Sequence, residues 1–152
     1  MASRAVDRTA RSLACGALAA GQALWIWSLS ARGVGQRRGY WWSVAADGIH
    51  YPLFGVLALL LAEALAFLPR GSLARRAVSV AAAGLYGVVD EWHQSSTAGR
   101  HGDPWDVVTD LLGAVGFVQF WYGWWGPGSR RAGALWLAAS AGLALARIVG
   151  VR

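Results

Sequence analysis

The sequence contains no lysine, a single cysteine and only 14% charged residues over its 152 positions. Soluble domains carry about 25% charged residues, so this low content excludes a disordered chain and most soluble folds. Cys15 has no second cysteine with which to form an intrachain bridge, which excludes a disulfide-stapled scaffold. The remainder is mainly apolar, with 56% hydrophobic residues and a mean hydropathy of +0.38, and this composition is typical of a membrane protein.

All fourteen basic residues are arginine, and the formal net charge of the chain is +6. A positive balance indicates nucleic-acid binding when the charge is gathered into one patch or stripe. Here the arginines stand in short groups between apolar runs, as topology-determining residues of membrane proteins do. The distribution therefore predicts no nucleic-acid partner.

Five apolar runs define the expected fold. A helix needs about 20 residues to cross a bilayer core. The first two runs are long enough alone, and the other three are long enough if each helix continues through its polar flanks. We expect an all-α, polytopic transmembrane helix bundle that forms one integral membrane domain over residues 1–152. Its helices are predicted at 12–30, 49–68, 77–94, 106–125 and 132–149, and the alternative for the last is a helix lying in the membrane interface.

The N-terminal region resembles a signal peptide in having arginines before an apolar run. That run is about 19 residues long, beyond the roughly 7–15 of a signal-peptide core, so we expect a retained span. With a cytoplasmic N-terminus, the inner connections hold eight arginines (4, 8, 11, 70, 75, 76, 130 and 131) and the outer ones six. This bias favours a multi-pass plasma-membrane protein with its N-terminus inside.

Acidic residues are concentrated in one segment. Five of the eight lie between positions 90 and 110, where Arg100 is the only basic residue. An alternating path of helices brings the start of the second, the end of the third and the start of the fourth to one side of the membrane. The polar residues expected together there are Asp47, His50, Asp90, Glu91, Gln94, Arg100, Asp106 and Asp110.

Helical spacing assigns faces within this group. Tyr86, Asp90 and Gln94 share one face of the third helix. Gly84 and Gly87 share another face with Glu91, and small residues there let a neighbouring helix approach closely. We therefore expect Glu91 to face protein rather than lipid. The alternative to a functional site is a purely structural role for these acids. An acid at a helix start, such as Asp106, is stabilised by the helix dipole.

A family resemblance adds to this interpretation. Residues 85–94 read LYGVVDEWHQ, Arg100 follows, and residues 106–113 read DVVTDLLG. This pattern resembles the signature of the VanZ-like membrane proteins, which runs Asp-Glu-x-x-Gln, a loop Arg, and Asp-x-x-x-Asn-x-x-Gly. His50 and Phe54 match a His–aromatic pair of that family, and the resemblance covers about 47–116.

Three positions depart from the family pattern. Asp47 stands where the family often has Lys, Phe54 where it often has Tyr, and Asp110 where it often has Asn. The resemblance implies a small multi-spanning envelope protein of the kind linked to teicoplanin resistance. It implies no known reaction.

Three functions remain open at this stage. The first is an envelope protein that handles an amphiphile at the outer face, with a membrane lipid or a lipid-linked envelope precursor as its partner. The second is a membrane-embedded hydrolase of a lipid phosphate, in which His50, Asp90, Glu91 and Asp106 hold a divalent metal or act as general acid and base. The third is a proton-coupled carrier, in which Glu63 would be an additional relay. Whether the chain is an enzyme, and its oligomeric state, are left open.

The candidate residues divide by role. Gln94, Arg100 and Asp110 are the expected ligand-binding residues, with Arg100 paired to a carboxylate until an anion replaces it. Candidate catalytic or proton-transferring residues are His50, Asp90, Glu91 and Asp106. No spacing matches a recognised metal motif, so no metal ligand and no cofactor is assigned.

Overall fold

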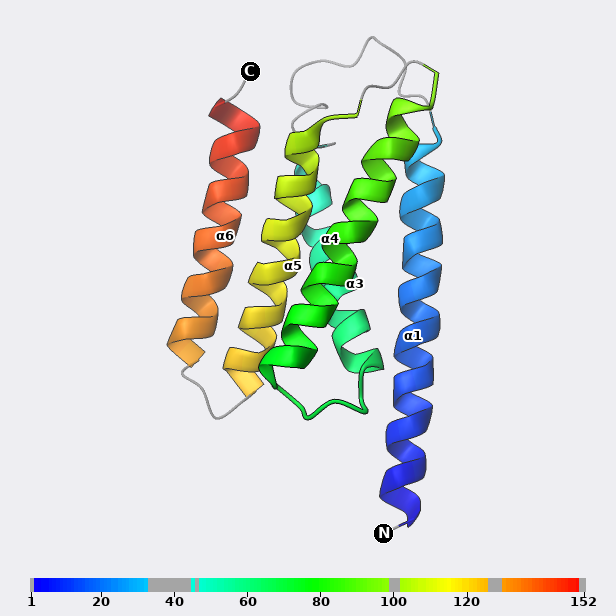
Figure 1. The fold of residues 1–152 in the computed structure, drawn as a ribbon. Coiled ribbons are helices and arrows are strands. Elements are labelled where there is room, and N and C mark those ends of the chain that lie inside the picture. Colours follow the sequence, from blue (N-terminus) through cyan, green and yellow to red (C-terminus); the bar gives the residue numbers. More distant parts are fainter. Residues whose placement is uncertain (1, 33–44, 46, 99–101, 126–129, 151–152) are drawn as a thin grey trace.

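The computed structural model describes residues 2–32, 45, 47–98, 102–125 and 130–150, and these residues form five α-helices and no strand (Figure 1). The expected all-α class is therefore confirmed for the described part of the chain. The helices are α1 (Ala2–Ser30), α3 (His50–Ala64), α4 (Leu73–Ser95), α5 (Pro104–Trp125) and α6 (Arg130–Gly150).

Successive helices run in opposite directions, so their ends meet at two opposite ends of the bundle (Figure 1). α3 and α5 lie at the centre and pack against each other. α1 packs on α3 and α4, and α6 packs on α5. The ends of α1 and α4 and the starts of α3 and α5 therefore lie at the same end of the bundle, as the alternating path predicts.

The predicted end of the second helix at 68 is wrong, because α3 ends at Ala64. Its C-cap, Leu65, leaves helical geometry with φ −77° and ψ 42°. Pro69 disfavours helical geometry at the residue before it, and Gly71 adopts a φ of 73° that favours glycine. A tight turn results, in which the Ser72 N–H donates to the Pro69 carbonyl at 3.1 Å.

The other helices begin earlier than predicted. α4 begins at Leu73 rather than 77, because the Ser72 hydroxyl caps it by accepting from the Arg75 N–H at 3.2 Å. α5 begins at Pro104 rather than 106, since proline suits the first turn of a helix. α1 and α6 also extend into arginine-containing flanks that apolarity alone leaves out.

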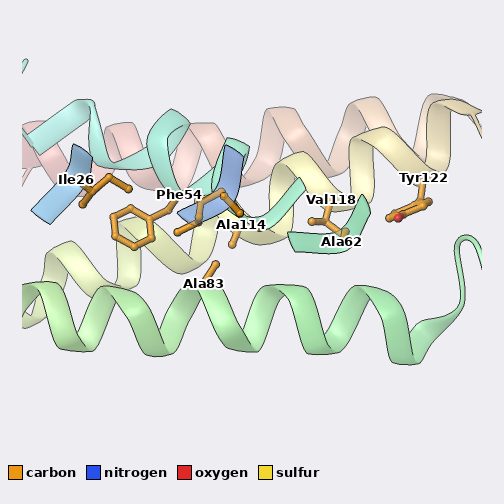
Figure 2. Close-up of a cluster of buried hydrophobic side chains, with 10 residues drawn as sticks. Ile26, Phe54, Ala62, Ala83, Ala114, Val118 and Tyr122 are labelled. Carbon is orange, nitrogen blue, oxygen red and sulfur yellow. The ribbon is translucent and has the colours of Figure 1, made fainter. Parts of the chain in front are cut away.

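The core is a narrow row of small and aromatic side chains along the bundle. Figure 2 shows it running from Ile26 and Phe54 at one end, past Ala83 and Ala114, to Tyr122 at the other. Small residues in the middle of the row let helix backbones approach closely. The interior is thus narrow, and Phe54 and Tyr122 are among the large side chains buried in it, while many other large apolar side chains stay outside.

Large apolar side chains point outward. Exposed leucines occur on α1, α4, α5 and α6, among them Leu13, Leu24, Leu85, Leu111, Leu135 and Leu143, and α3 exposes Val56. Two helical stretches, Val6–Ser30 and Arg130–Gly150, are long and apolar enough to cross a membrane, and α3 is apolar but shorter. Before α3, the Ile49 N–H donates to the Ala45 carbonyl, and at its other end the N–H of the C-cap Leu65 donates to the Leu61 carbonyl.

Glycine is required where α5 meets its neighbours. A Cβ at Gly87 would lie 2.7 Å from Oδ2 of Asp110, so α4 can approach α5 there only without a side chain. A Cβ at Gly113 would overlap the carbonyl oxygen of Tyr51 on α3. Glu91, on the Gly87 stripe, is only 8% exposed, which confirms that it faces protein.

We therefore expect Gly87→Leu to lower the free energy of unfolding by at least about 1–3 kcal/mol, because the new side chain overpacks the α4–α5 contact. Leu85→Ala is the matched control, since Leu85 on the same helix is 68% exposed, and its cost should stay near about 0.5 kcal/mol. Thermal unfolding in detergent measures both variants. Equal tolerance of the two substitutions would contradict close packing at Gly87.

Candidate functional site

Figure 1 shows the end of the bundle where α1 and α4 end and α3 and α5 begin. Polar side chains gather at this end. We call this group the polar cluster, and it comprises Ser30, His50, Asp90, Glu91, Gln94, Asp106, Thr109 and Asp110. Every helix except α6 contributes to it. The convergence predicted from the sequence is thus confirmed for the bundle end, and Asp47 lies half-buried just before α3.

Asp90 joins α4 to α1. Its Oδ1 accepts a hydrogen bond of 2.6 Å from the Ser30 hydroxyl, and its Oδ2 accepts one of 2.9 Å from the Gln94 amide. One turn away on the same face, the Tyr86 hydroxyl donates to the Ala23 carbonyl of α1 at 2.5 Å. The predicted face of Tyr86, Asp90 and Gln94 is therefore the face of α4 that meets α1.

Glu91 joins α4 to the segment before α5. Its Oε2 accepts the backbone N–H of Asp103 at 2.6 Å, and its Oε1 accepts the Gln94 amide at 3.1 Å. Asp103 in turn organises the start of α5, since its Oδ1 accepts the Trp105 N–H at 2.9 Å. Glu91 therefore helps to fix where α5 begins.

His50 and Asp110 link α3 to α5. Nδ1 of His50 lies 3.0 Å from Oδ1 of Asp110, whose side chain is fully buried. The carboxylate can only accept, so Nδ1 carries the proton of this hydrogen bond. Oδ2 of Asp110 faces Gly87 and has no hydrogen-bond partner among the described residues. A buried, half-satisfied carboxylate is costly, and a donor or cation near it is the usual compensation.

The cluster has an inner and an outer layer. Asp90, Gln94 and Asp110 are almost completely closed to solvent. His50 has a 12% exposed side chain, and Glu91 and Asp106 are 8% and 9% exposed. Asp90 and Asp110 of the inner layer bond to side chains of other helices. The outer three are the members of the cluster that keep some solvent exposure.

These three outer residues also form a possible metal site. One potential ligand atom from each of His50, Glu91 and Asp106 lies within 4.8 Å of the other two. Because Asp110 holds Nδ1 of His50, Nε2 is the ring nitrogen that remains for a ligand. Metal-binding histidines commonly hold their second nitrogen against a carboxylate in this way. A nitrogen and two carboxylates suit a divalent cation.

The sequence did not identify every member of the cluster. Ser30 and Thr109 are buried there, yet hydroxyls in apolar runs carry no distinctive pattern. Ser30 could have been found as the polar residue that ends the first apolar run on the converging side. The aromatic ring of Trp27 stacks on His93 with ring centroids 3.6 Å apart, which encloses the α1 side of the cluster. Arg100, the predicted anion contact, lies outside the described residues.

We expect Ser30→Ala to destabilise the protein by about 1–3 kcal/mol, because it leaves Oδ1 of the buried Asp90 without its donor. The control is Ser28→Ala, since the Ser28 hydroxyl donates only within α1, to the Trp25 carbonyl at 2.8 Å. Denaturation in detergent compares the two variants. Equal losses would show that the bond between α1 and α4 contributes nothing of its own.

Comparison with family models, with curated proteins and with solved structures gives no match for this chain. The resemblance to VanZ-like proteins stays a prediction from sequence. The site is therefore interpreted from its own geometry.

Proposed function

We propose that the chain is a multi-pass protein of the plasma membrane, with its N-terminus in the cytoplasm, that handles an amphiphile of the cell envelope at the outer face. The observation that carries the proposal is the polar cluster, buried at one end of a bundle whose outward side chains are largely apolar. Ionisable residues inside a membrane are costly and usually mark a functional site. Outward leucines on the helices have a favourable environment in lipid, and a poor one in water.

The chemistry of the outer layer suits a headgroup rich in hydroxyls or amines. Glu91 and Asp106 offer acceptor oxygens, and His50 offers a ring nitrogen at the same place. An acyl or polyprenyl tail would lie along the apolar exterior beside the cluster. A membrane lipid or a lipid-linked envelope precursor combines both parts.

Binding of an anionic headgroup requires a positive charge near it. The polar cluster instead contains four carboxylates. Asp90, Glu91, Asp106 and Asp110 would repel such a headgroup, and His50 is already bonded to Asp110. Arg100 is the residue that the sequence offers for this role, since guanidinium binds phosphate through two parallel hydrogen bonds. A divalent cation on the outer layer would supply the same charge.

The test is glycopeptide susceptibility of cells that express the chain, with membrane insertion measured separately. Glu91→Gln should abolish any teicoplanin protection, because the amide keeps the size of Glu91 but loses its charge. Asp7→Asn is the control, an equal change on an exposed acid of α1. The proposal would fail if Glu91→Gln kept full protection at normal expression.

Arg100 variants distinguish two roles for that residue. If a guanidinium fork recognises an anion, Arg100→Lys should be nearly as damaging as Arg100→Ala. If Arg100 only balances charge, lysine should keep most of the protection. Full protection by Arg100→Ala would remove both roles.

A second candidate function, metal-assisted hydrolysis of a lipid phosphate, is favoured by the grouping of His50, Glu91 and Asp106. These residues would hold the cation, with Asp110 orienting His50 from behind. A bound divalent ion supplies Lewis-acid polarisation of a phosphoryl oxygen. No nucleophilic serine or cysteine is among the three outer residues of the cluster, so water would be the nucleophile.

Metal titration of the detergent-solubilised, chelator-treated protein tests this second function. Calorimetry with Mn²⁺ or Zn²⁺ should show one saturable site per chain, weakened at least about tenfold by His50→Ala. His93→Ala is the control, because His93 lies at the same end of the bundle and stacks on Trp27 instead. Equal weakening by both variants, or no saturable binding, would contradict a metal site.

A further inference from the structure

A second site lies at the opposite end of the bundle from the polar cluster. There, a cavity of about 350 Å³ opens between α1, the turn after α3 and the start of α4. Its charged lining consists of Arg8, Arg11, Arg70, Arg75 and Glu63. Four positive charges against one negative charge leave the cavity with a surplus of +3.

Glu63 is fully engaged within this lining. Its Oε2 lies 3.3 Å from Arg11 and 3.5 Å from Arg75. Its Oε1 accepts hydrogen bonds from the Trp121 indole and the Tyr122 hydroxyl, each at 3.3 Å. The carboxylate that only the carrier hypothesis made an additional relay is therefore held by two arginines and two aromatic donors. It has little capacity left to neutralise further charge.

Arg75 forms the fixed wall of the cavity. Its side chain is buried, its Nε donates to the Ala62 carbonyl, and its guanidinium lies 5.9 Å from the Tyr122 ring centroid. A long, charged side chain held this firmly is preorganised, so little entropy is lost when it binds an anion.

Arg8 and Arg70 supply the unbalanced charge. Both are exposed, and within the described part of the chain neither lies at ion-pair distance from an acid. Arg130 and Arg131, at the same end of the bundle, do not line this cavity, and the Arg130 guanidinium lies 5.5 Å from the Trp124 ring centroid. At the cavity, by contrast, arginines from two helices and a turn converge on one space.

The rim of the cavity is apolar. Phe67, in the turn after α3, is 78% exposed, and Leu68 follows it in the lining. An aromatic and an aliphatic side chain beside a basic cavity match the junction between a phosphate headgroup and its acyl chains. Basic pockets between helices on the cytoplasmic side of membrane proteins bind anionic headgroups by this combination.

We infer that this cavity binds a phosphate-bearing anion, with Arg8 and Arg70 as its contacts and Arg75 as its fixed wall. The anion is the headgroup of a membrane lipid or a soluble phosphate, and both present the same oxygens to the guanidinium groups. The site is independent of the polar cluster and of the function proposed for it. Either can fail without the other.

The experiment is calorimetric titration of the full chain in a neutral detergent. Three probes are used: short-chain phosphatidylglycerol, short-chain phosphatidylcholine and inorganic phosphate. The double variant Arg8→Gln/Arg70→Gln removes two charges from the cavity. The double variant Arg130→Gln/Arg131→Gln removes the same charge from the same end of the bundle, outside the cavity. Melting curves of both variants check that the fold is kept.

We expect phosphatidylglycerol to bind the wild type, and the cavity variant to weaken this binding at least about tenfold. The control variant should change it less than about twofold, since screened charges outside the cavity contribute little. The same pattern with inorganic phosphate would identify a soluble anion as the ligand. Equal weakening by the two double variants, or no binding of either anionic probe, would overturn the inference.

Discussion

Asp110 is a carboxylate with no solvent exposure at the point where three helices meet. The position of the whole polar cluster depends on the neighbouring groups that surround this carboxylate. An isolated buried charge is costly, so its neighbours must either donate to it or leave space for it. His50 donates from α3, and Gly87 leaves the space on α4. Because these contacts join three helices, satisfying Asp110 also fixes the relative heights of α3, α4 and α5.

The helices themselves could be predicted from the sequence, but their ends could not. Apolar runs identify the part of each helix that avoids water, whereas hydrogen bonds and caps decide where it begins and ends. α3 ends at Ala64, before the turn that contains Pro69 and Gly71, and the Ser72 cap starts α4 early. The grouping of acids at one end of the bundle follows from alternation alone, and was therefore predictable.

The arrangement inside the cluster could not be derived from the sequence. His50, Glu91 and Asp106 are far apart in the chain, and no ligand spacing connects them. Their proximity arises from the tilt and height of three helices, which packing at glycines determines. The contact between Ser30 and Asp90 has the same origin, because which face of α1 meets α4 depends on the shapes of both helices. The basic cavity was missed because its arginines resemble ordinary topology residues until the turn between α3 and α4 is in place.

The position of α6 has a consequence for the order in which the protein assembles. α6 packs on α5, and Ser140 Oγ lies 2.8 Å from the Tyr51 hydroxyl of α3, yet none of the described side chains of α6 belongs to the polar cluster or lines the basic cavity. Synthesis proceeds from the N-terminus, and α1, α3, α4 and α5 all precede α6 in the chain. The four helices that hold the carboxylates and the arginines are therefore made before α6. Both ends of the bundle can take shape while α6 is still being made, and its docking then closes the outer side of α5.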